Sequence, residues 1–313
     1  MNDTIGIDIS KATLDAFRRS TGEHRQFPND ANGCKALIRW IRLAHPETTR
    51  VLFEPTGPYH RMLELALLAA GLHLVKVNPR SARRFAEATG ILAKTDRIDA
   101  SVLAGMGAIL DLQGRAARTE IQYDLKELSV ARQALIKDRV AAKSRQATVV
   151  NALLKRQFAA RIKQIKSQLA DIDAAILTRI QEDPVLARRF DILCSIPGIG
   201  RITAAALLID MPELGAMDNK QIASLAGLAP MVRQSGGWNG RARIRGGRRQ
   251  IRITLYMPAV ASLRCNPHLK KTFDALSDAG KHAKLALTAV MRKLLIFANS
   301  LLRDDRKWNE IRA

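Results

Sequence analysis

The feature that most limits the fold of this chain is a long stretch without glycine or proline. Neither residue occurs from position 115 to position 183. Proline and glycine are the residues least compatible with a helix interior, so a stretch of this length predicts long helices.

Apolar residues within this stretch recur at spacings of three and four, with Lys, Arg, Gln and Asp between them: Ile162, Ile165, Leu169, Ile172 and Ile176. This is the pattern of a short coiled-coil seam. We expect a helical arm whose seam folds back on the earlier helix around Leu125, Leu128 and Leu135, or pairs with another subunit. The sequence leaves both arrangements open, and an arm of this kind is typical of dimers.

Short apolar segments and helical patterns alternate before this stretch. Strands are predicted at residues 4–8, 13–18, 24–27, 50–54 and 72–77, and helices at 32–43, 60–70 and after Thr95. The order is three strands, helix, strand, helix, strand, helix. That is the layout of a ribonuclease H-like (RuvC-like) fold, in which acidic residues gather at the ends of the first and fourth strands and on the last helix. We therefore expect an α/β domain over residues 1–114, a helical coiled-coil arm over 115–184 and a mostly helical domain over 185–313.

Four carboxylates occupy those positions. Asp8 and Glu54 end apolar strands, where an unpaired carboxylate is costly unless it faces solvent or a cation. Asp96 and Asp99 are three residues apart, so they share one face of a helix that Thr95 is expected to cap. Such a pair alone is an ordinary solvated helix start. Together the four residues predict a Mg²⁺ site that polarises a phosphate and stabilises a leaving oxygen.

The charge of the chain indicates its partner. Lys and Arg number 51 against 29 Asp and Glu, a formal net charge of +22, which favours nucleic acid. A membrane surface is the alternative, and it needs an apolar segment of about 18 residues or an amphipathic anchor. We expect neither, because stretches such as 63–72 and 204–209 are short. The N-terminus reaches Asp3 without a signal-peptide core, so the expected location is cytoplasmic.

A proline- and glycine-rich turn lies near the start of the third part. Residues 193–204 read LCSIPGIGRITA, which resembles the hairpin of a helix-hairpin-helix DNA-binding module. We expect phosphate contacts from Ser195, Gly198, Gly200 and Thr203, since glycines let backbone N–H groups approach a phosphate. A plain turn between two buried helices is the other interpretation.

A serine followed by two glycines is the last candidate for a functional residue. Ser235 precedes Gly236 and Gly237, and arginines follow without one acid up to Ile253, among them Arg241, Arg243, Arg245, Arg248 and Arg249. The glycines leave the hydroxyl accessible and the arginines suit phosphate binding. Residue types alone favour a flexible segment on nucleic-acid backbone, because serine needs activation and no His or Lys base is adjacent. Tyr256 is a competing nucleophile, but its apolar helical setting predicts a packed core tyrosine.

These motifs, in this order, match a known family. The chain resembles the transposases of the insertion-sequence one-ten family, the Asp-Glu-Asp-Asp recombinases guided by a bridge RNA. The resemblance spans essentially the whole length, through residues 6–15 (GIDISKATLD), 53–57 (FEPTG), 94–100 (KTDRIDA), 196–200 (IPGIG) and 228–256. Each motif is weak alone, and their order and spacing are specific.

The resemblance implies roles for five residues. Asp8, Glu54, Asp96 and Asp99 correspond to the family's metal-binding tetrad, and Ser235 to its nucleophile. The implied reaction is attack of the serine on a DNA phosphate activated by Mg²⁺, giving a covalent phosphoserine link and a free 3′ hydroxyl for strand exchange. Also implied are donor and target DNA, a noncoding bridge RNA that guides them, a composite active site in a dimer to tetramer, and a bacterial, nucleoid-associated location.

Three functions are compatible with these features of the sequence. The leading expectation is an RNA-guided DNA recombinase of a mobile insertion element. A Holliday-junction-type endonuclease would use the same acids with metal-activated water, and Ser235 would only bind. A non-catalytic nucleic-acid scaffold would use the basic surface and the arm. If the protein were such a scaffold, replacing all four acids would not abolish its function.

Overall fold

The computed structural model describes residues 3–43, 49–110, 112, 119–232, 234–240 and 242–308. The chain forms two compact units, Met1–Thr119 and Glu120–Ala313. Each is built around its own apolar core.

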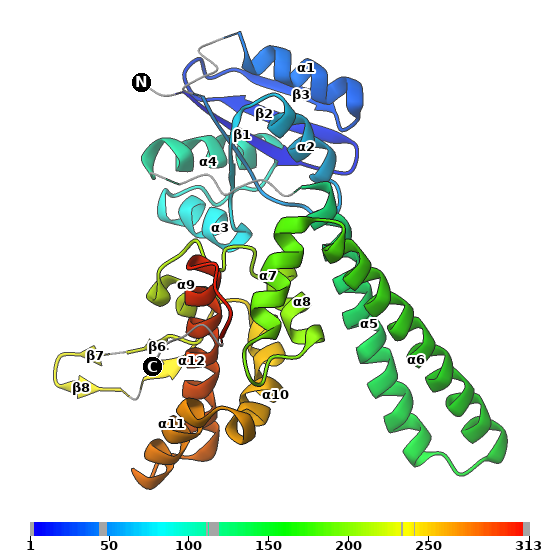
Figure 1. Cartoon of the computed structure of the whole chain (residues 1–313). Coiled ribbons are helices and arrows are strands. Elements are labelled where there is room, and N and C mark those ends of the chain that lie inside the picture. Colours follow the sequence, from blue (N-terminus) through cyan, green and yellow to red (C-terminus); the bar gives the residue numbers. More distant parts are fainter. Residues whose placement is uncertain are drawn as a thin grey trace. The chain divides into compact units, whose positions relative to one another are not determined.

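The first unit is a mixed sheet with helices (Figure 1). Its elements are β1 (Thr4–Ile9), β2 (Thr13–Arg18), β3 (His24–Pro28), α1 (Ala31–Ile41), β4 (Arg50–Phe53), α2 (Arg61–Ala69), β5 (His73–Lys76), α3 (Pro79–Ala88) and α4 (Asp96–Ile109). The strand order is β3-β2-β1-β4-β5, with β1, β2 and β3 antiparallel and β1, β4 and β5 parallel. The predicted strands are confirmed, and the mixed α/β arrangement is consistent with a RuvC-like domain.

Apolar side chains cover both faces of this sheet. Ile5, Ile7 and Phe53 pack with residues of α1 and α2 on one face, and Leu52 and Val75 pack with α3 and α4 on the other. Alternate residues of a strand point to opposite faces, so a sheet buried on both sides requires continuous apolar strands. This explains why β1 and β4 read as unbroken apolar runs up to their carboxylates.

Helix α4 lies very close to β1. A Cβ atom on Gly6 would come within 2.0 Å of the Ala100 carbonyl oxygen and 2.5 Å of the Ala104 nitrogen, so only glycine fits there. The Thr4 hydroxyl also donates to the Ala104 carbonyl at 3.0 Å. These contacts fix α4 against the strand that carries Asp8.

One helix of this unit is absent from the sequence prediction. Residues 78–79 follow the strand predicted at 72–77, and they begin α3, for which no helix was predicted. Asn78 caps the helix by accepting from the Arg80 N–H at 2.9 Å, and Pro79 occupies its first turn. Proline is well tolerated at that position, because the N–H it lacks would have no partner within the helix.

The second unit is mostly helical. Its elements are α5 (Glu120–Thr148), α6 (Ala152–Gln181), α7 (Pro184–Cys194), α8 (Arg201–Asp210), α9 (Asn219–Leu225), β6 (Pro230–Met231), β7 (Gln234–Ser235), β8 (Trp238–Asn239), β9 (Arg243–Ile244), α10 (Arg249–Cys265), α11 (Pro267–Asp278) and α12 (Ala283–Arg303). A single core joins α7, α8, α10 and α12 with the inner ends of α5 and α6.

Helices α5 and α6 pack against each other and project from the rest of this unit (Figure 1). Ile162, Ile165, Leu169 and Ile176 are buried along α6, and Ile172 packs against the core. The apolar spacing of three and four thus marks the buried face of α6. The assignment of this pair as a coiled coil stays a prediction.

Helix α12 departs from the expectation that no segment is apolar and long enough to span a membrane. Within the described part of the chain, α12 alone meets that test of length and composition. Half of its most apolar window is buried, and Val290, Leu294 and Leu295 belong to the core of the second unit. The apolar composition of α12 is therefore that of a core helix.

Candidate active site

Asp8 and Glu54 stand at the same edge of the first unit's sheet. β1 and β4 run parallel, with Gly6 opposite Leu52, and both carboxylates come at the ends of these strands. Because alternate residues share a face, Asp8 lies on the face of Gly6 and Glu54 on that of Leu52. That face is the one covered by α4.

The first turn of α4 supplies the other two acids. The Thr95 side chain accepts from the Ile98 N–H at 3.2 Å, which confirms the predicted cap. Asp96 is exposed and Asp99 half-buried in that turn, where the positive end of the helix dipole favours negative charge.

The four carboxylates repel one another. The pKa of Asp8 is raised to about 6, first by burial and then by the charges of Asp96 and Asp99, with a smaller effect from Glu54. Burial and Asp99 raise the pKa of Glu54. Burial and Asp96 likewise raise the pKa of Asp99. The structure therefore brings the predicted tetrad into one electrostatically coupled cluster.

This cluster suits a hard divalent cation by its donor chemistry. All four side chains offer carboxylate oxygens, the ligands that Mg²⁺ and Mn²⁺ take, and a bound cation would relieve the repulsion among them. Among the described residues, no three His, Cys, Asp or Glu side chains are already arranged to hold an ion. Binding would thus have to draw the carboxylates together.

Two cations act on the same cluster. The charge of Lys94 offsets part of the rise in the pKa of Glu54 and of Asp99, and the charge of Arg83 offsets part of the rise for Asp99. Lys94 directly precedes the cap of α4, and Arg83 lies on α3. The role of Arg83 depends on α3, the helix that sequence reasoning missed.

A fifth carboxylate adjoins the cluster and was also missed. Asp15 is the cross-strand partner of Asp8, so both side chains lie on one face of the ladder. Asp15 is buried, and both its oxygens accept from Gln26 Nε2, at 3.0 and 3.2 Å. His24 Nε2 lies 3.3 Å from Asp15 Oδ1. The register of the β1–β2 hairpin was the signal that could have found it.

Ser235 lies in the second unit, on a glycine hairpin. It pairs with Trp238 across β7 and β8, and Gly236 has a left-handed φ of 53°, which glycine adopts without strain. Ser235 is exposed, and its hydroxyl forms no hydrogen bond within the described part of the chain. A nucleophile at this position is accessible, and none of the described residues of its own unit activates it.

The base of this hairpin is fixed while its tip is free. β6 pairs with β9 below the tip. The Arg252 guanidinium donates to the Gly246 and Ala226 carbonyls at 2.6 and 3.1 Å. Ser235 comes four residues after Met231, the last residue of β6. Figure 1 shows the β7–β8 tip extending away from α12 of the same unit.

The predicted nucleic-acid residues divide into two groups. Arg243, Arg245 and Arg249 are exposed. Arg248 is instead held inside the fold, donating to both Glu213 carboxylate oxygens at 2.6 Å and to the Asp210 carbonyl at 2.7 Å. Arg241 lies outside the described residues.

The predicted contact residues of the Pro-Gly turn between α7 and α8 also differ, because some are held by the fold and others are accessible. The Ser195 hydroxyl donates to the Ile192 carbonyl at 2.6 Å and accepts from the Trp308 N–H at 2.9 Å. Gly198 packs against Ser262 of α10. Gly200 is exposed and Thr203 half-buried at the start of α8. Of the four predicted contact residues, Gly200 is thus the most accessible.

Tyr256 is not the packed core residue that the sequence predicted. Its side chain is 42% exposed on α10, beside Met257 at 64%. Apolar neighbours in the sequence misled here, because α10 turns one apolar stripe away from the core. Tyr256 therefore stays accessible as a competing nucleophile.

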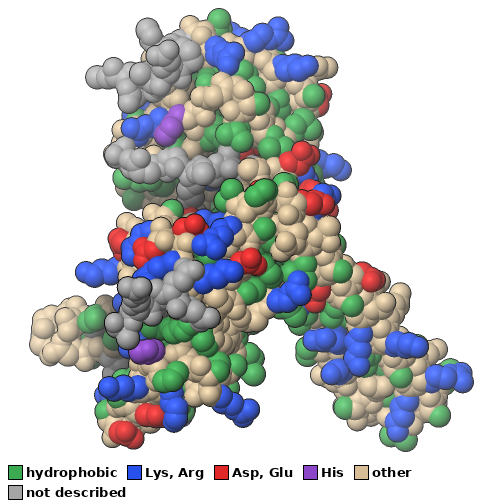
Figure 2. Space-filling view, in the orientation of Figure 1, with side chains coloured by type: hydrophobic (Ala, Val, Ile, Leu, Met, Phe, Trp, Pro, Cys, Tyr) green, Lys and Arg blue, Asp and Glu red, His purple; other side chains and the backbone are tan. Residues whose placement is uncertain are grey.

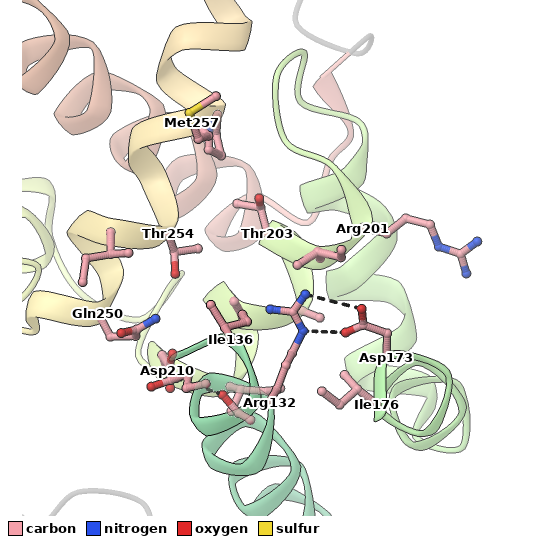
Figure 3. Close-up of a pocket in the computed structure, with 18 of the residues that line it drawn as sticks. Arg132, Ile136, Asp173, Ile176, Arg201, Thr203, Asp210, Gln250, Thr254 and Met257 are labelled. Atoms are coloured by element: carbon pink, nitrogen blue, oxygen red, sulfur yellow. Dashed lines mark hydrogen bonds and ion pairs between the residues drawn. The ribbon is translucent and has the colours of Figure 1, made fainter. Parts of the chain in front are cut away.

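A cavity of about 280 Å³ lies where α5, α6, α8 and α10 meet. Figure 3 shows its lining, including Thr203, Gln250 and Met257, with Arg132 paired to Asp173 across the root of the arm. The Arg132 Nε to Asp173 Oδ1 distance is 2.5 Å. The cavity's two carboxylates are each held in an ion pair, Asp173 with Arg132 and Asp210 with Lys126.

The raised pKa of Asp8 predicts how stability depends on pH. The folded chain holds this proton more tightly than the unfolded chain does. In metal-free protein this group therefore favours folding below about pH 4, and the contribution is lost as pH rises to about 6. We expect Asp8→Asn to stabilise metal-free protein relative to wild type by about 1 kcal/mol at pH 7.5. This allows for screening of the half-exposed group.

Thermal unfolding in a chelator at pH 4.5 and 7.5 checks this. The variant's advantage should be larger at the higher pH. Excess Mg²⁺ should then stabilise wild type more than the variant, because an ion that binds only the folded state raises its stability. An advantage of the variant that does not grow with pH would contradict the coupling.

Comparisons with known proteins identify the family. Residues 5–158 match a family of DEDD transposases of the IS110 type, described as Transposase. Residues 190–274 match the family described as Transposase IS116/IS110/IS902 family. The two matched segments contain the four acids and Ser235, respectively.

Relatives of known name agree. The chain is 30% identical over 318 residues to the pilin gene-inverting proteins of Moraxella bovis and Moraxella lacunata, covering 98% of this chain and 97% of each of those proteins. It is 32% identical over 163 residues to an insertion element IS900 protein of Mycobacterium paratuberculosis, covering 50% of this chain and 38% of that protein. The chain belongs to the IS110 family of transposases and is a DNA transposase or recombinase that depends on a divalent metal.

Proposed function

We propose that this transposase is an RNA-guided serine recombinase. In this proposal the Ser235 hydroxyl attacks a DNA phosphate, forming a phosphoserine bond and releasing a 3′ hydroxyl that later attacks in strand exchange. The carrying observation is that the chain presents two complementary parts: a coupled cluster of four carboxylates and an exposed, unbonded serine on a glycine hairpin.

Each part would supply one half of the chemistry. Asp8, Glu54, Asp96 and Asp99 would hold Mg²⁺, which when bound polarises the phosphate and stabilises the leaving oxygen. Ser235 would supply the attacking oxygen. Arg243, Arg245 and Arg249 would hold the neighbouring phosphates by bidentate hydrogen bonds, with Gly200 and Thr203 as further backbone contacts.

The two parts would meet between subunits. By the family resemblance, the acids of one subunit join the serine of another in a dimer to tetramer. An exposed serine at the tip of a hairpin, with no activating partner among the described residues of its own unit, supports such sharing. The division into domains 1–114, 115–184 and 185–313, with the middle part as a coiled-coil arm, belongs to this proposal, as does a cytoplasmic, nucleoid-associated location.

The DNA reaction would include inversion as well as insertion. The Moraxella relatives, matched over nearly their full length, are named for inverting a pilin gene. Cutting two sites and exchanging the ends gives inversion when both sites lie on one molecule in opposite orientation. Transposition of an insertion element would use the same two chemical steps at separate sites.

A guide RNA is the most specific part of the proposal, and it is tested directly. Protein purified with the noncoding DNA that flanks its gene should carry a defined RNA. Recombination of donor and target plasmids should stop after ribonuclease treatment and return when that RNA is added back. Changes in the RNA's complementary loops should redirect the target. Full recombination by RNA-free protein would contradict guidance without excluding the serine chemistry.

A Holliday-junction-type nuclease is the second candidate. The four acids form a coupled cluster within one unit without any serine, which is the arrangement that activation of water requires. Under this alternative Ser235 would only bind DNA. Loss of cleavage on replacing an acid, but not on replacing Ser235, would favour it.

A further inference from the structure

The outer half of the α5–α6 arm carries a concentrated positive charge that the fold does not use. Between residues 137 and 170 the only acid is Asp138. Nine cations occupy this stretch, which we call the outer arm: Lys137, Arg139, Lys143, Arg145, Lys155, Arg156, Arg161, Lys163 and Lys166. All but Arg139 are exposed. Figure 2 shows Lys and Arg side chains gathered toward the arm's tip, with acids nearer its root.

The root of the arm is different. There the cations are matched by acids: Arg132 pairs with Asp173, Arg179 with Asp124 and Glu182, and Lys126 with Asp210. None of the nine outer-arm cations forms an ion pair in the part of the chain that the structure describes. Charge is therefore segregated along one continuous pair of helices.

This segregation has a cost in the free protein. Arg139 and Lys143 are spaced by four residues and Lys163 and Lys166 by three, so each pair repels by a few tenths of a kcal/mol. The buried seam of Ile162, Ile165 and Leu169 already joins the helices, and acids at some of these positions would add favourable pairs. The cations are thus not explained by the stability of the arm.

We propose that the outer arm binds the phosphate backbone of a nucleic-acid duplex. Its charged length is about 20 Å by helix rise, along which a duplex presents roughly a dozen phosphates. Arg156, Lys163 and Lys166 are spaced by seven and three residues, so they lie on one face of α6. Uniform positive charge without acids binds phosphates in either RNA or DNA.

Two other partners fit less well. A second arm tip would bring nine more cations against these nine, and like charges disfavour that contact. A membrane would need an apolar helix face to insert. The seam residues Ile162, Ile165 and Leu169 of α6 are buried, and its exposed apolar residues Leu153 and Leu154 are confined to the first turn, where they make no continuous face. The duplex backbone is the partner that matches both the charge and the buried seam.

The test changes three charges and leaves the chemistry untouched. The full-length triple variant Arg156→Gln, Lys163→Gln, Lys166→Gln is compared with Lys271→Gln, Lys281→Gln, Lys284→Gln. This control removes three exposed cations from α11, from the turn that follows it and from the start of α12. Neither set includes an acid of the tetrad or Ser235. Circular dichroism and the thermal midpoint confirm that both variants stay folded.

Binding is measured to a duplex RNA, a duplex DNA and vesicles of phosphatidylserine and phosphatidylcholine. The outer-arm variant should bind at least one duplex ten- to a hundredfold more weakly than the control. The slope of log affinity against log salt should fall by about 2 to 3. Which duplex loses affinity identifies the source of the phosphates. Equal duplex binding by the two variants would overturn the proposal, as would a loss confined to vesicles or to self-association.

Discussion

Replacing Ser235 with alanine is expected to abolish the covalent protein–DNA adduct and to lower strand exchange by roughly a thousandfold or more, since removal of a covalent nucleophile leaves only binding and electrostatic effects. DNA binding should change little, because Ser235 is exposed on the β7–β8 hairpin and forms no hydrogen bond within the described residues. The measurement is denaturing electrophoresis of labelled DNA, with recombination of two plasmids as the readout of exchange.

Ser277→Ala is the matched control. It removes an exposed serine hydroxyl that donates to the Phe273 carbonyl within α11, and it should leave adduct and exchange unchanged. Adducts that persist in the Ser235 variant would remove serine from the nucleophilic role. Tyr256, exposed on α10, would then become the first alternative.

Asp99→Asn is expected to reduce strand cleavage by a factor as large as that expected for Ser235→Ala. Asparagine keeps the shape of the side chain but removes the charge through which Asp99 couples to Asp8 and Glu54. The cluster then has three carboxylates for a divalent metal instead of four. Cleavage should fall about a thousandfold or more, as is usual for loss of transition-state charge stabilisation. Asp278→Asn, an exposed acid at the end of α11, is the control.

The same variants test whether subunits share the site. Mixed oligomers of Asp99→Asn and Ser235→Ala protein should regain cleavage if the acids of one subunit meet the serine of another. The restored activity should depend on mixing before assembly. If the mixture stays as inactive as either variant alone, each active site is built from a single subunit.

Much of the first unit could be predicted because its signals are local. Short apolar segments marked the strands, and Thr95 with two acids in the following turn marked the start of α4. Helix α3 was not predicted because Asn78 and Pro79 are as typical of a turn as of a helix start. Only the packing of α3 against the sheet favours the helix over the turn.

Tertiary partners explain the remaining differences. Arg248 looked like a phosphate ligand, but Glu213, 35 residues earlier, holds its guanidinium. Asp15 looked like an ordinary polar residue of a strand, but the hairpin register sets it beside Asp8. An apolar segment of sequence does not show which of its side chains will be buried. For this reason the long apolar helix α12 was not predicted, and Tyr256 was placed in the core although it is exposed.

The most direct test of the serine mechanism is to locate the covalent link. DNA cleaved in the presence of Mg²⁺ is quenched with denaturant, digested with nuclease and protease, and examined by mass spectrometry for a peptide that carries a nucleotide. The nucleotide is expected on the Ser235 hydroxyl, and none is expected on that peptide when Asp99 is replaced by asparagine. A nucleotide on Tyr256, or cleaved DNA with no linked peptide at all, would contradict it.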